Sequence, residues 1–237
     1  AIGLGAAAVV RVLLIGSNLL DSASPAPGGQ PTASVAPTEA ERSVEPSSAA
    51  GLPVHLLWLE PVRIDVTIPA PGWYGEPANG ILVKNDDPDP PDGAGLIVFE
   101  GPMYVYGDPC QWSTTKPDTP ATTVDELVAA LSAQASRDAT APVDVTVGGF
   151  TGKSITLHVP DDAVFSDCDQ GYFGTLVDSL EPTPSRYHQG PGQIDELWIL
   201  DVNGVLVIID TAYYAGTPAA DVEELRAIVE SATFQSP

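Results

Sequence analysis

Apolar and polar residues alternate along several stretches of the chain, a period of two that is typical of strands with one buried face. In 62–68 every even-numbered residue is apolar and every odd-numbered residue is polar or charged. The same alternation on both sides of the glycine-rich turn 148–152 predicts a hairpin. Shorter apolar runs predict further strands, at 81–83, 96–99, 103–106 and 171–177.

A second hairpin is expected near the C-terminus, with strands at 194–201 and 205–213. Asn203-Gly204 lies between them, and this pair tolerates the positive φ angles of a two-residue turn. The run 205–209 is continuously apolar, which indicates a central strand that is buried on both faces.

Two segments show helical spacing instead. The segment 123–136 carries apolar residues three or four positions apart, and Thr123 and Glu126 form a capping box at its start. A second helix is expected after Thr217-Pro218, with Thr217 as N-cap, and Phe234 then returns to the sheet. This order predicts an α+β fold, a mostly antiparallel sheet with two packed helices.

Composition divides the chain into three zones. The segment 1–20 is apolar apart from Arg11, and its length predicts a transmembrane anchor; a cleaved signal peptide and a buried helix remain as alternatives. The segment 21–53 is rich in Pro, Ser and Ala without aromatic residues, which predicts a disordered stalk. All the Trp, Tyr and Phe residues fall in 54–237, the expected folded domain outside the cytoplasm. Because the chain begins with Ala and its only methionine is Met103, we expect further sequence upstream.

The charge of the chain excludes some classes of partner, and its cysteine content predicts a disulfide. The chain has 32 acidic and 9 basic residues and a net charge of −23, which argues against binding nucleic acid or anionic lipid headgroups. Cys110 and Cys168 are the only cysteines, and outside the cytoplasm they are expected to form a disulfide. Two free thiols or a redox-active pair are the alternatives.

Several stretches resemble an uncharacterised, membrane-anchored extracytoplasmic domain of actinobacteria. They include Val105–Cys110, Thr123–Leu127, Val147–Lys153, Gln189–Gln193, Leu197–Gly204 and Glu224–Ser231. The final hairpin and helix are also distantly similar to the PsbP-like and LpqN-type α/β/α sandwich. The resemblance implies a fold and a location at the cell membrane. It implies no reaction, because that family has no assigned activity.

Motifs for catalysis are missing from the sequence. It has no G-x-S-x-G elbow, no H-E-x-x-H and no phosphate-binding loop. The acidic loop 85–93 does not fit the ligand register of an EF-hand, so we interpret it as solvated. We therefore expect no catalytic residues, no metal, no cofactor and no enzyme activity.

The remaining functional signal is aromatic. We expect an interaction surface formed by the loop Tyr187-His188-Gln189 with Trp112 and Tyr172, although an ordinary tight turn is the alternative for this loop. The leading hypothesis is a membrane-tethered, non-catalytic domain that binds or senses an envelope protein or a small ligand.

Two alternatives remain, and the sequence sets no oligomeric state. One is a cell-envelope hydrolase, which would be favoured if His188 lay within hydrogen-bond reach of a Ser hydroxyl and an Asp carboxylate inside a pocket. The other is the outer part of an anti-sigma or signalling protein whose cytoplasmic region precedes Ala1.

Overall fold

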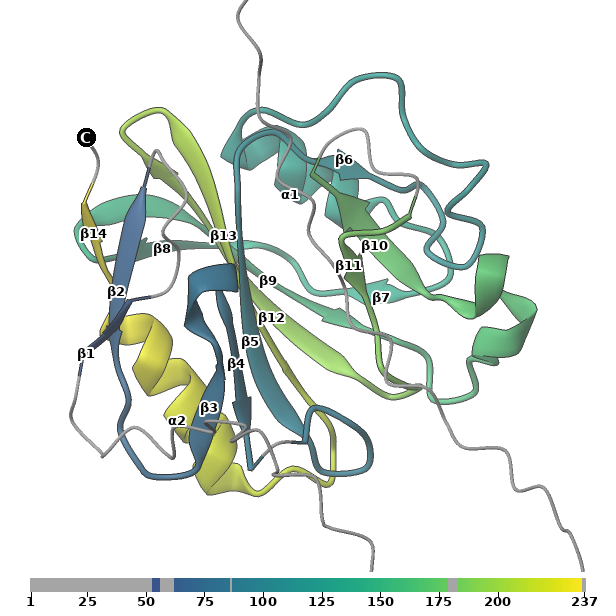
Figure 1. Cartoon of the computed structure of the whole chain (residues 1–237). Helices are drawn as coiled ribbons and strands as arrows, with labels where there is room; N and C mark the ends of the chain where they lie inside the picture. The colour runs from purple at the N-terminus through teal and green to yellow at the C-terminus, as the bar shows by residue number, and fades with distance from the viewer. Residues whose placement is uncertain (1–52, 56–61, 86, 179–182, 236–237) are drawn as a thin grey trace, which may run out of the picture. The chain divides into compact units, whose positions relative to one another are not determined.

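The computed structural model describes residues 53–55, 62–85, 87–178 and 183–235 (Figure 1), all of which belong to one compact unit. The expected anchor, 1–20, and the expected stalk, apart from its last residue, lie outside these ranges. Among the described residues, no helix is both long enough and apolar enough to cross a membrane.

The centre of the described unit is an eight-stranded sheet. Its strands in spatial order are β3 (Trp73–Glu76), β4 (Ile81–Lys84), β5 (Ala94–Glu100), β13 (Val205–Tyr213), β12 (Ile194–Val202), β9 (Phe150–His158) and β7 (Asp138–Ala139), with β8 (Val143–Val147) also paired to β9. Every pairing is antiparallel. As the apolar run predicts, β13 lies in the middle of the sheet and most of its residues are buried.

Both faces of this sheet are covered (Figure 1). One face packs against α2 (Ala219–Glu230) and a small sheet of β1 (Pro53–His55), β2 (Arg63–Thr67) and β14 (Thr233–Gln235). The other face packs against α1 (Val124–Ser132) and a second small sheet of β6 (Tyr104–Val105), β10 (Gly174–Val177) and β11 (Arg186–Tyr187). Alternate side chains of β13 pack into the two hydrophobic cores, with Val207 in the core on the α2 side and Ile208 in the core on the α1 side. Short 3-10 turns occur at Pro77–Asn79, Phe165–Asp167 and Asp169–Gly171.

The predicted α+β class is confirmed, and the described part of the chain contains the two expected helices. The capping box of α1 is present, with Glu126 N donating to Thr123 Oγ1 and Thr123 N donating to the Glu126 carboxylate. The helix ends at Ser132 rather than residue 136. Beyond it the chain turns, so that Gln134 Nε2 can donate to the carbonyl oxygens of Tyr106 and Thr175.

The expected N-cap of α2 is wrong. Thr217 Oγ1 accepts from Tyr214 N at 2.9 Å and donates to the Gly93 carbonyl at 2.8 Å, so it fastens two loops together instead of capping the helix. Pro218 occupies the N-cap position without a side-chain hydrogen bond. Phe234 returns to a strand as expected, but its strand β14 pairs with β2 in a small sheet.

Candidate functional site

A cluster of polar and charged side chains is buried between the main sheet and the small sheet β6–β10–β11. Two aspartates of the main sheet contribute, Asp195 from β12 and Asp210 from β13. Both lie on the α1 side of the sheet, because residues two positions away, Leu197 and Ile208, belong to the core on that side. We call the whole set the polar cluster, and its members are Arg137, Thr175, Arg186, His188, Gln193, Asp195 and Asp210, none of them more than 9% exposed.

Asp195 is the centre of the polar cluster. Its Oδ2 accepts from Arg137 Nη2 at 3.0 Å, and its Oδ1 accepts from Arg186 Nη2 at 2.8 Å and from Gln193 Nε2 at 2.7 Å. Burial opposes ionisation of this carboxyl, but the charges of His188 (when it is protonated), Arg186 and Arg137 outweigh burial and lower the pKa of Asp195 to about 2. The carboxylate is therefore an anion held between two guanidinium groups.

The second carboxyl of the polar cluster behaves differently. Burial raises the pKa of Asp210 to about 7 against the attraction of Arg186, and repulsion from Asp195 adds to the rise. Arg186 Nε donates to Asp210 Oδ2 at 2.6 Å, while the buried Asp210 Oδ1 has no hydrogen-bond partner among the described residues. Burial thus opposes the ionisation of Asp210.

His188 lies between a hydroxyl and a carboxylate. Its Nε2 is 2.6 Å from Thr175 Oγ1 and its Nδ1 is 3.1 Å from Asp195 Oδ2. Arg137 Nη1 lies 3.3 Å from the same Nε2 and also donates to Thr175 Oγ1 at 2.8 Å. Gln193 Nε2 lies 3.1 Å from Nδ1, so an amide or guanidinium donor faces each ring nitrogen of His188.

This arrangement has the connectivity of a hydroxyl–imidazole–carboxylate triad, with Thr175 in the place of serine. Its surroundings differ from those of an active site. Thr175, His188 and Asp195 are 2%, 3% and 1% exposed, and the hollow described below is not lined by any of them. Burial lowers the pKa of His188 well below its usual value, so the imidazole is neutral. His188 therefore has the hydroxyl and carboxylate contacts that a hydrolase would need, with a threonine in place of the serine. It does not lie in a pocket that a substrate could enter.

The structure divides the expected interaction surface. Tyr172 and Tyr187 are half-buried, with ring centroids 5.2 Å apart, and Gln189 is exposed beside them. Trp112 is 2% exposed, and its indole donates to the Asp169 carbonyl at 2.9 Å. His188, in the polar cluster, is equally hidden. The accessible part is Tyr172, Tyr187 and Gln189, which we call the tyrosine surface.

The loop that carries Gln189 is anchored to the polar cluster. Gln189 N donates to Gln193 Oε1 at 3.0 Å, and the Tyr214 hydroxyl donates to the same oxygen at 3.2 Å. A Cβ on Gly190 would lie 2.8 Å from Pro90 Cγ, so the Gly-Pro-Gly stretch also permits close packing against the acidic loop. The loop is a fixed part of the fold rather than a loose connector.

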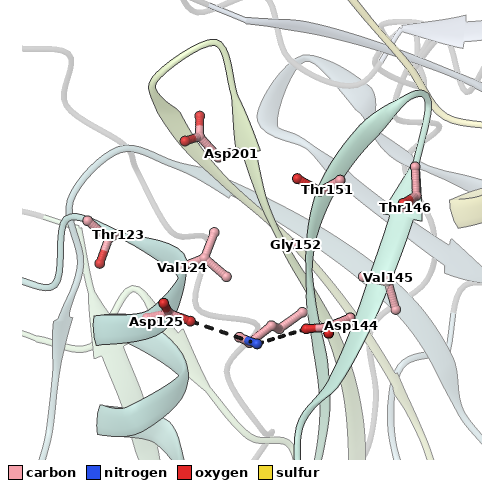
Figure 2. Close-up of a pocket in the computed structure, with 10 residues that line it drawn as sticks. Thr123, Val124, Asp125, Asp144, Val145, Thr146, Thr151, Gly152 and Asp201 are labelled. Atoms are coloured by element: carbon pink, nitrogen blue, oxygen red, sulfur yellow. Dashed lines mark hydrogen bonds and ion pairs between the residues drawn. The ribbon is translucent and has the colours of Figure 1, made fainter.

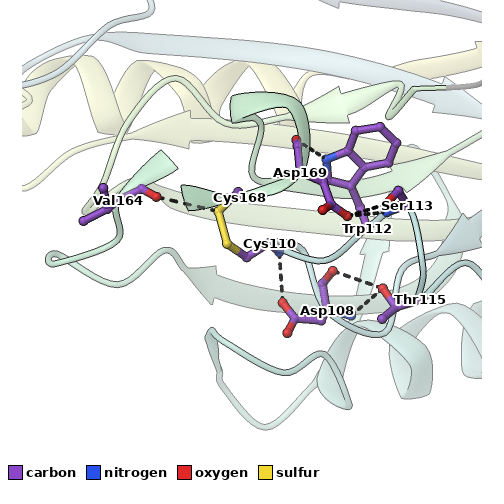
Figure 3. The surroundings of a disulfide bond; sticks show 8 residues. All are labelled: Asp108, Cys110, Trp112, Ser113, Thr115, Val164, Cys168 and Asp169. Atoms are coloured by element: carbon purple, nitrogen blue, oxygen red, sulfur yellow. Dashed lines mark hydrogen bonds between the residues drawn. A yellow bond between two sulfur atoms is a disulfide. The ribbon is translucent and has the colours of Figure 1, made fainter. Parts of the chain in front are cut away.

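The expected disulfide is present. Cys110 and Cys168 are bonded, with their Cα atoms 4.5 Å apart (Figure 3). Around the bond, Asp108 Oδ1 accepts from Cys110 N, and Asp169 Oδ2 accepts from the backbone N–H and the hydroxyl of Ser113. The disulfide thus joins the loop after β6 to the loop before β10 and stabilises the base of the tyrosine surface.

An open hollow of about 620 Å³ lies on another part of the unit, between the start of α1 and the β8–β9 hairpin (Figure 2). Seven of its ten lining residues are polar or charged, and the full lining is Thr123, Val124, Asp125, Asp144, Val145, Thr146, Thr151, Gly152, Lys153 and Asp201. Lys153 Nζ lies 2.8 Å from Asp144 and 3.8 Å from Asp125. Among the described residues, no group of three or more His, Cys, Asp or Glu side chains is placed to hold a metal ion.

Comparison with known proteins gives a distant likeness. No family model and no curated protein matches the chain. The chain is similar to LpqN, a protein involved in cell envelope biogenesis of Mycobacterium tuberculosis, with 13% identity and a TM-score of 0.39 over 78% of this chain and 91% of LpqN. It is also similar to PsbP (CyanoP) of the cyanobacterium Synechocystis sp. PCC 6803, with 14% identity and a TM-score of 0.32 over 76% of this chain and 94% of CyanoP. The distant likeness to PsbP-like and LpqN-type proteins that the sequence indicates is confirmed, and no function is carried over from it.

The sequence analysis did not find the polar cluster, although the signal was available. Strand alternation places Asp195 on the same face as Leu197, and Asp210 on the same face as Ile208. An aspartate on a core face requires a donor, and a chain with nine basic residues offers few. The sequence does not show that Arg137 and Arg186 are the donors to these aspartates, because both arginines lie outside β12 and β13.

Proposed function

We propose that the chain is a non-catalytic binding domain that works outside the cytoplasm, tethered to the membrane through 1–20. The main support for a non-catalytic role is that the polar cluster is not accessible to a substrate. Thr175 and His188 are arranged like a nucleophile and its base, but Arg137 contacts both of them and the surrounding core leaves each no more than 3% exposed. The polar cluster therefore stabilises the fold and does not react with a substrate.

Other features support the location and the binding role. A disulfide such as Cys110–Cys168 persists in oxidising compartments, which supports a place outside the cytoplasm. The tether rests on the length and apolar character of 1–20. The tyrosine surface supplies two half-buried rings on a base fixed by the disulfide and the polar cluster, and fixed aromatic groups bind at a low cost in conformational entropy.

Affinity capture from an envelope fraction tests the proposal. The wild-type chain is compared with a triple variant, Tyr172→Ala, Tyr187→Ala and Gln189→Ala, and with the control Glu223→Ala, an exposed position on α2. We expect one defined partner or ligand to be lost with the triple variant and retained with the control. If the triple variant retains every ligand that the wild type captures, the tyrosine surface is not the binding surface.

A hydrolase is the second candidate, and the Thr175–His188–Asp195 array is the observation that favours it. In that reaction Thr175 Oγ1 would attack an ester carbonyl while His188 Nε2 takes its proton and gives it to the leaving alcohol, and water would then hydrolyse the acyl-enzyme. Ester hydrolysis by the full chain tests it directly, with Thr175→Val and His188→Gln as variants. Under our proposal the wild type shows no turnover above background, whereas turnover that both variants abolish while still folded would establish the hydrolase.

A further inference from the structure

The main sheet ends, on the side away from β3, in an exposed edge. In the described part of the chain β8 pairs with β9 alone, and no other backbone hydrogen bond reaches 143–147. Every residue of 138–146 is exposed except Val145, which is half-buried. An edge of this kind can accept another strand.

The hairpin geometry shows which backbone groups are free. The turn consists of Gly148 and Gly149, with φ angles of 55° and 86°, so Val147 and Phe150 form the hydrogen-bonded pair that closes it. Hydrogen-bonded and non-bonded pairs alternate along an antiparallel ladder. The N–H and C=O groups of Asp144 and Thr146 therefore point away from β9, as a docking site for a strand requires.

The two faces of β8 differ in chemistry. Val145 and Val147 pack on the core of the α2 side, and Val143 extends that apolar row beyond the core with 57% of its surface exposed. Asp144 and Thr146 line the hollow on the other face (Figure 2). β8 contains no lysine or proline; Pro142 directly precedes it, and its one charged residue, Asp144, is negative.

Charge decides between the possible occupants. The hollow beside β8 is lined by three carboxylates, Asp125, Asp144 and Asp201, against the single ammonium group of Lys153. Pairing of β8 with a second copy would bring together two chains that each carry a net charge of −23. The same field attracts a basic segment.

We propose that β8 is a docking edge that takes an extended segment of a partner protein as an added strand. Apolar residues of that segment cover Val143, and alternate Lys or Arg residues enter the hollow beside Asp125, Asp144 and Asp201. This mode of recognition combines main-chain hydrogen bonds with side-chain pockets at alternate positions. The docking edge is separate from the tyrosine surface and does not depend on it.

Peptide binding to the full chain tests the docking edge. The probe is a synthetic peptide of alternating Val and Lys, and the control peptide alternates Val and Glu. We expect the Val/Lys peptide to bind, to lose affinity as salt rises from about 0.05 to about 0.5 M, and to slow hydrogen–deuterium exchange in 143–147. We expect no binding of the Val/Glu peptide.

Variants place the interaction on β8. Val143→Lys adds a charge to the edge, and Thr146→Pro removes an outward N–H that β9 does not use. The matched control is Val164→Lys, because Val164 is 55% exposed but lies far from β8 in sequence, beside the disulfide loop. We expect each edge variant to weaken peptide binding by about tenfold or more and the control to leave it unchanged. If Thr146→Pro does not fold, Val143→Lys alone decides.

Three results would overturn the proposal. The first is equal binding of the Val/Lys peptide by Val143→Lys and by the wild type. The second is peptide binding without slower exchange in 143–147. The third is a dimer of the full chain that Val143→Lys dissociates, because a second copy would then be the occupant. Loss of envelope capture by the tyrosine triple variant, with peptide binding intact, would leave the docking edge standing.

Discussion

Replacement of Asp195 by Asn tests whether the polar cluster is an ionised network. Asn keeps the size of the side chain but removes its negative charge and turns one acceptor into a donor. In the wild type, the two carboxylate oxygens accept from Arg137, Arg186 and Gln193. In the variant, one guanidinium faces an amide NH₂, and Arg137 loses the only carboxylate with which it forms an ion pair in the described part of the chain.

The loss of unfolding free energy in Asp195→Asn is large because the ion pair is buried. Arg137 and Asp195 have side chains that are 0% and 1% exposed, and removing one partner of such a pair costs about 3–5 kcal/mol. Arg186 retains Asp210, so we expect a value near the lower end, about 3 kcal/mol. For a domain of this size, with a urea slope of about 2 kcal/mol per molar, the unfolding midpoint should fall by about 1.5 M.

Urea unfolding of the wild type and Asp195→Asn at several pH values measures this effect. Because the folded pKa of Asp195 is lowered to about 2, its contribution is complete above the unfolded pKa near 4 and is lost as pH falls towards 2. The difference between the two proteins should therefore shrink as pH falls below about 4. The control, Asp144→Asn, removes an exposed carboxylate and should leave the midpoint unchanged. A loss of less than about 1 kcal/mol would refute the idea that Asp195 is the anionic centre.

Three further predictions concern stability. Replacing Cys110 and Cys168 together by Ala opens a loop of 58 residues and should lower the free energy of unfolding by about 4 kcal/mol, measured against the oxidised wild type; an unchanged midpoint would contradict the constraint. Thr123→Ala removes the N-cap of α1 and should cost about 1 kcal/mol in the same assay, with Thr123→Ser as a control that retains stability. Burial raises the pKa of Glu100 from 4.5 to about 7 against a backbone hydrogen bond from Val62, so the folded state retains the proton longer than the unfolded chain. Wild-type stability should therefore fall as pH rises from about 4.5 to about 7, and Glu100→Gln should flatten that decline; an identical pH profile would contradict it.

The parts of the fold that the sequence predicts are those with local signals. The β12–β13 hairpin follows from Asn203-Gly204 and two apolar strands, and the start of α1 follows from its capping box. Short strands such as β7 and β11 carry no such signal, since two residues are too few to show an alternation of apolar and polar positions. The end of α1 was misplaced for another reason: Gln134 leaves the helix to reach carbonyl groups on other elements.

In the candidate site, too, features with a local sequence signal were predicted and features that depend on tertiary contacts were not. Of the aromatic residues expected to form an interaction surface, Tyr172 and Tyr187 lie with their rings 5.2 Å apart and remain partly exposed, as Gln189 is exposed, while their role in binding stays a prediction. Trp112 is buried because the disulfide loop folds over the outer face of the small sheet, where Tyr106 and Val177 enclose it. His188 is buried because Thr175 and Asp195 come from two different sheets to meet it. Neither contact can be read from spacing along the chain.

The distribution of basic residues connects the stability of the fold with its choice of partner. At least six of the basic side chains in the described ranges form ion pairs with carboxylates, and Lys116 lies over the ring of Tyr104. Two of these six, Arg137 and Arg186, are buried in the polar cluster and contribute nothing to the surface. Asp195 and Asp210 are buried with these two arginines, so the polar cluster does not change the net charge of the surface. Most of the cations that remain at the surface are paired with carboxylates. A partner that docks at β8 or on the tyrosine surface must supply positive charge of its own, which is why salt dependence is a sharper test of either interface than affinity at a single salt concentration.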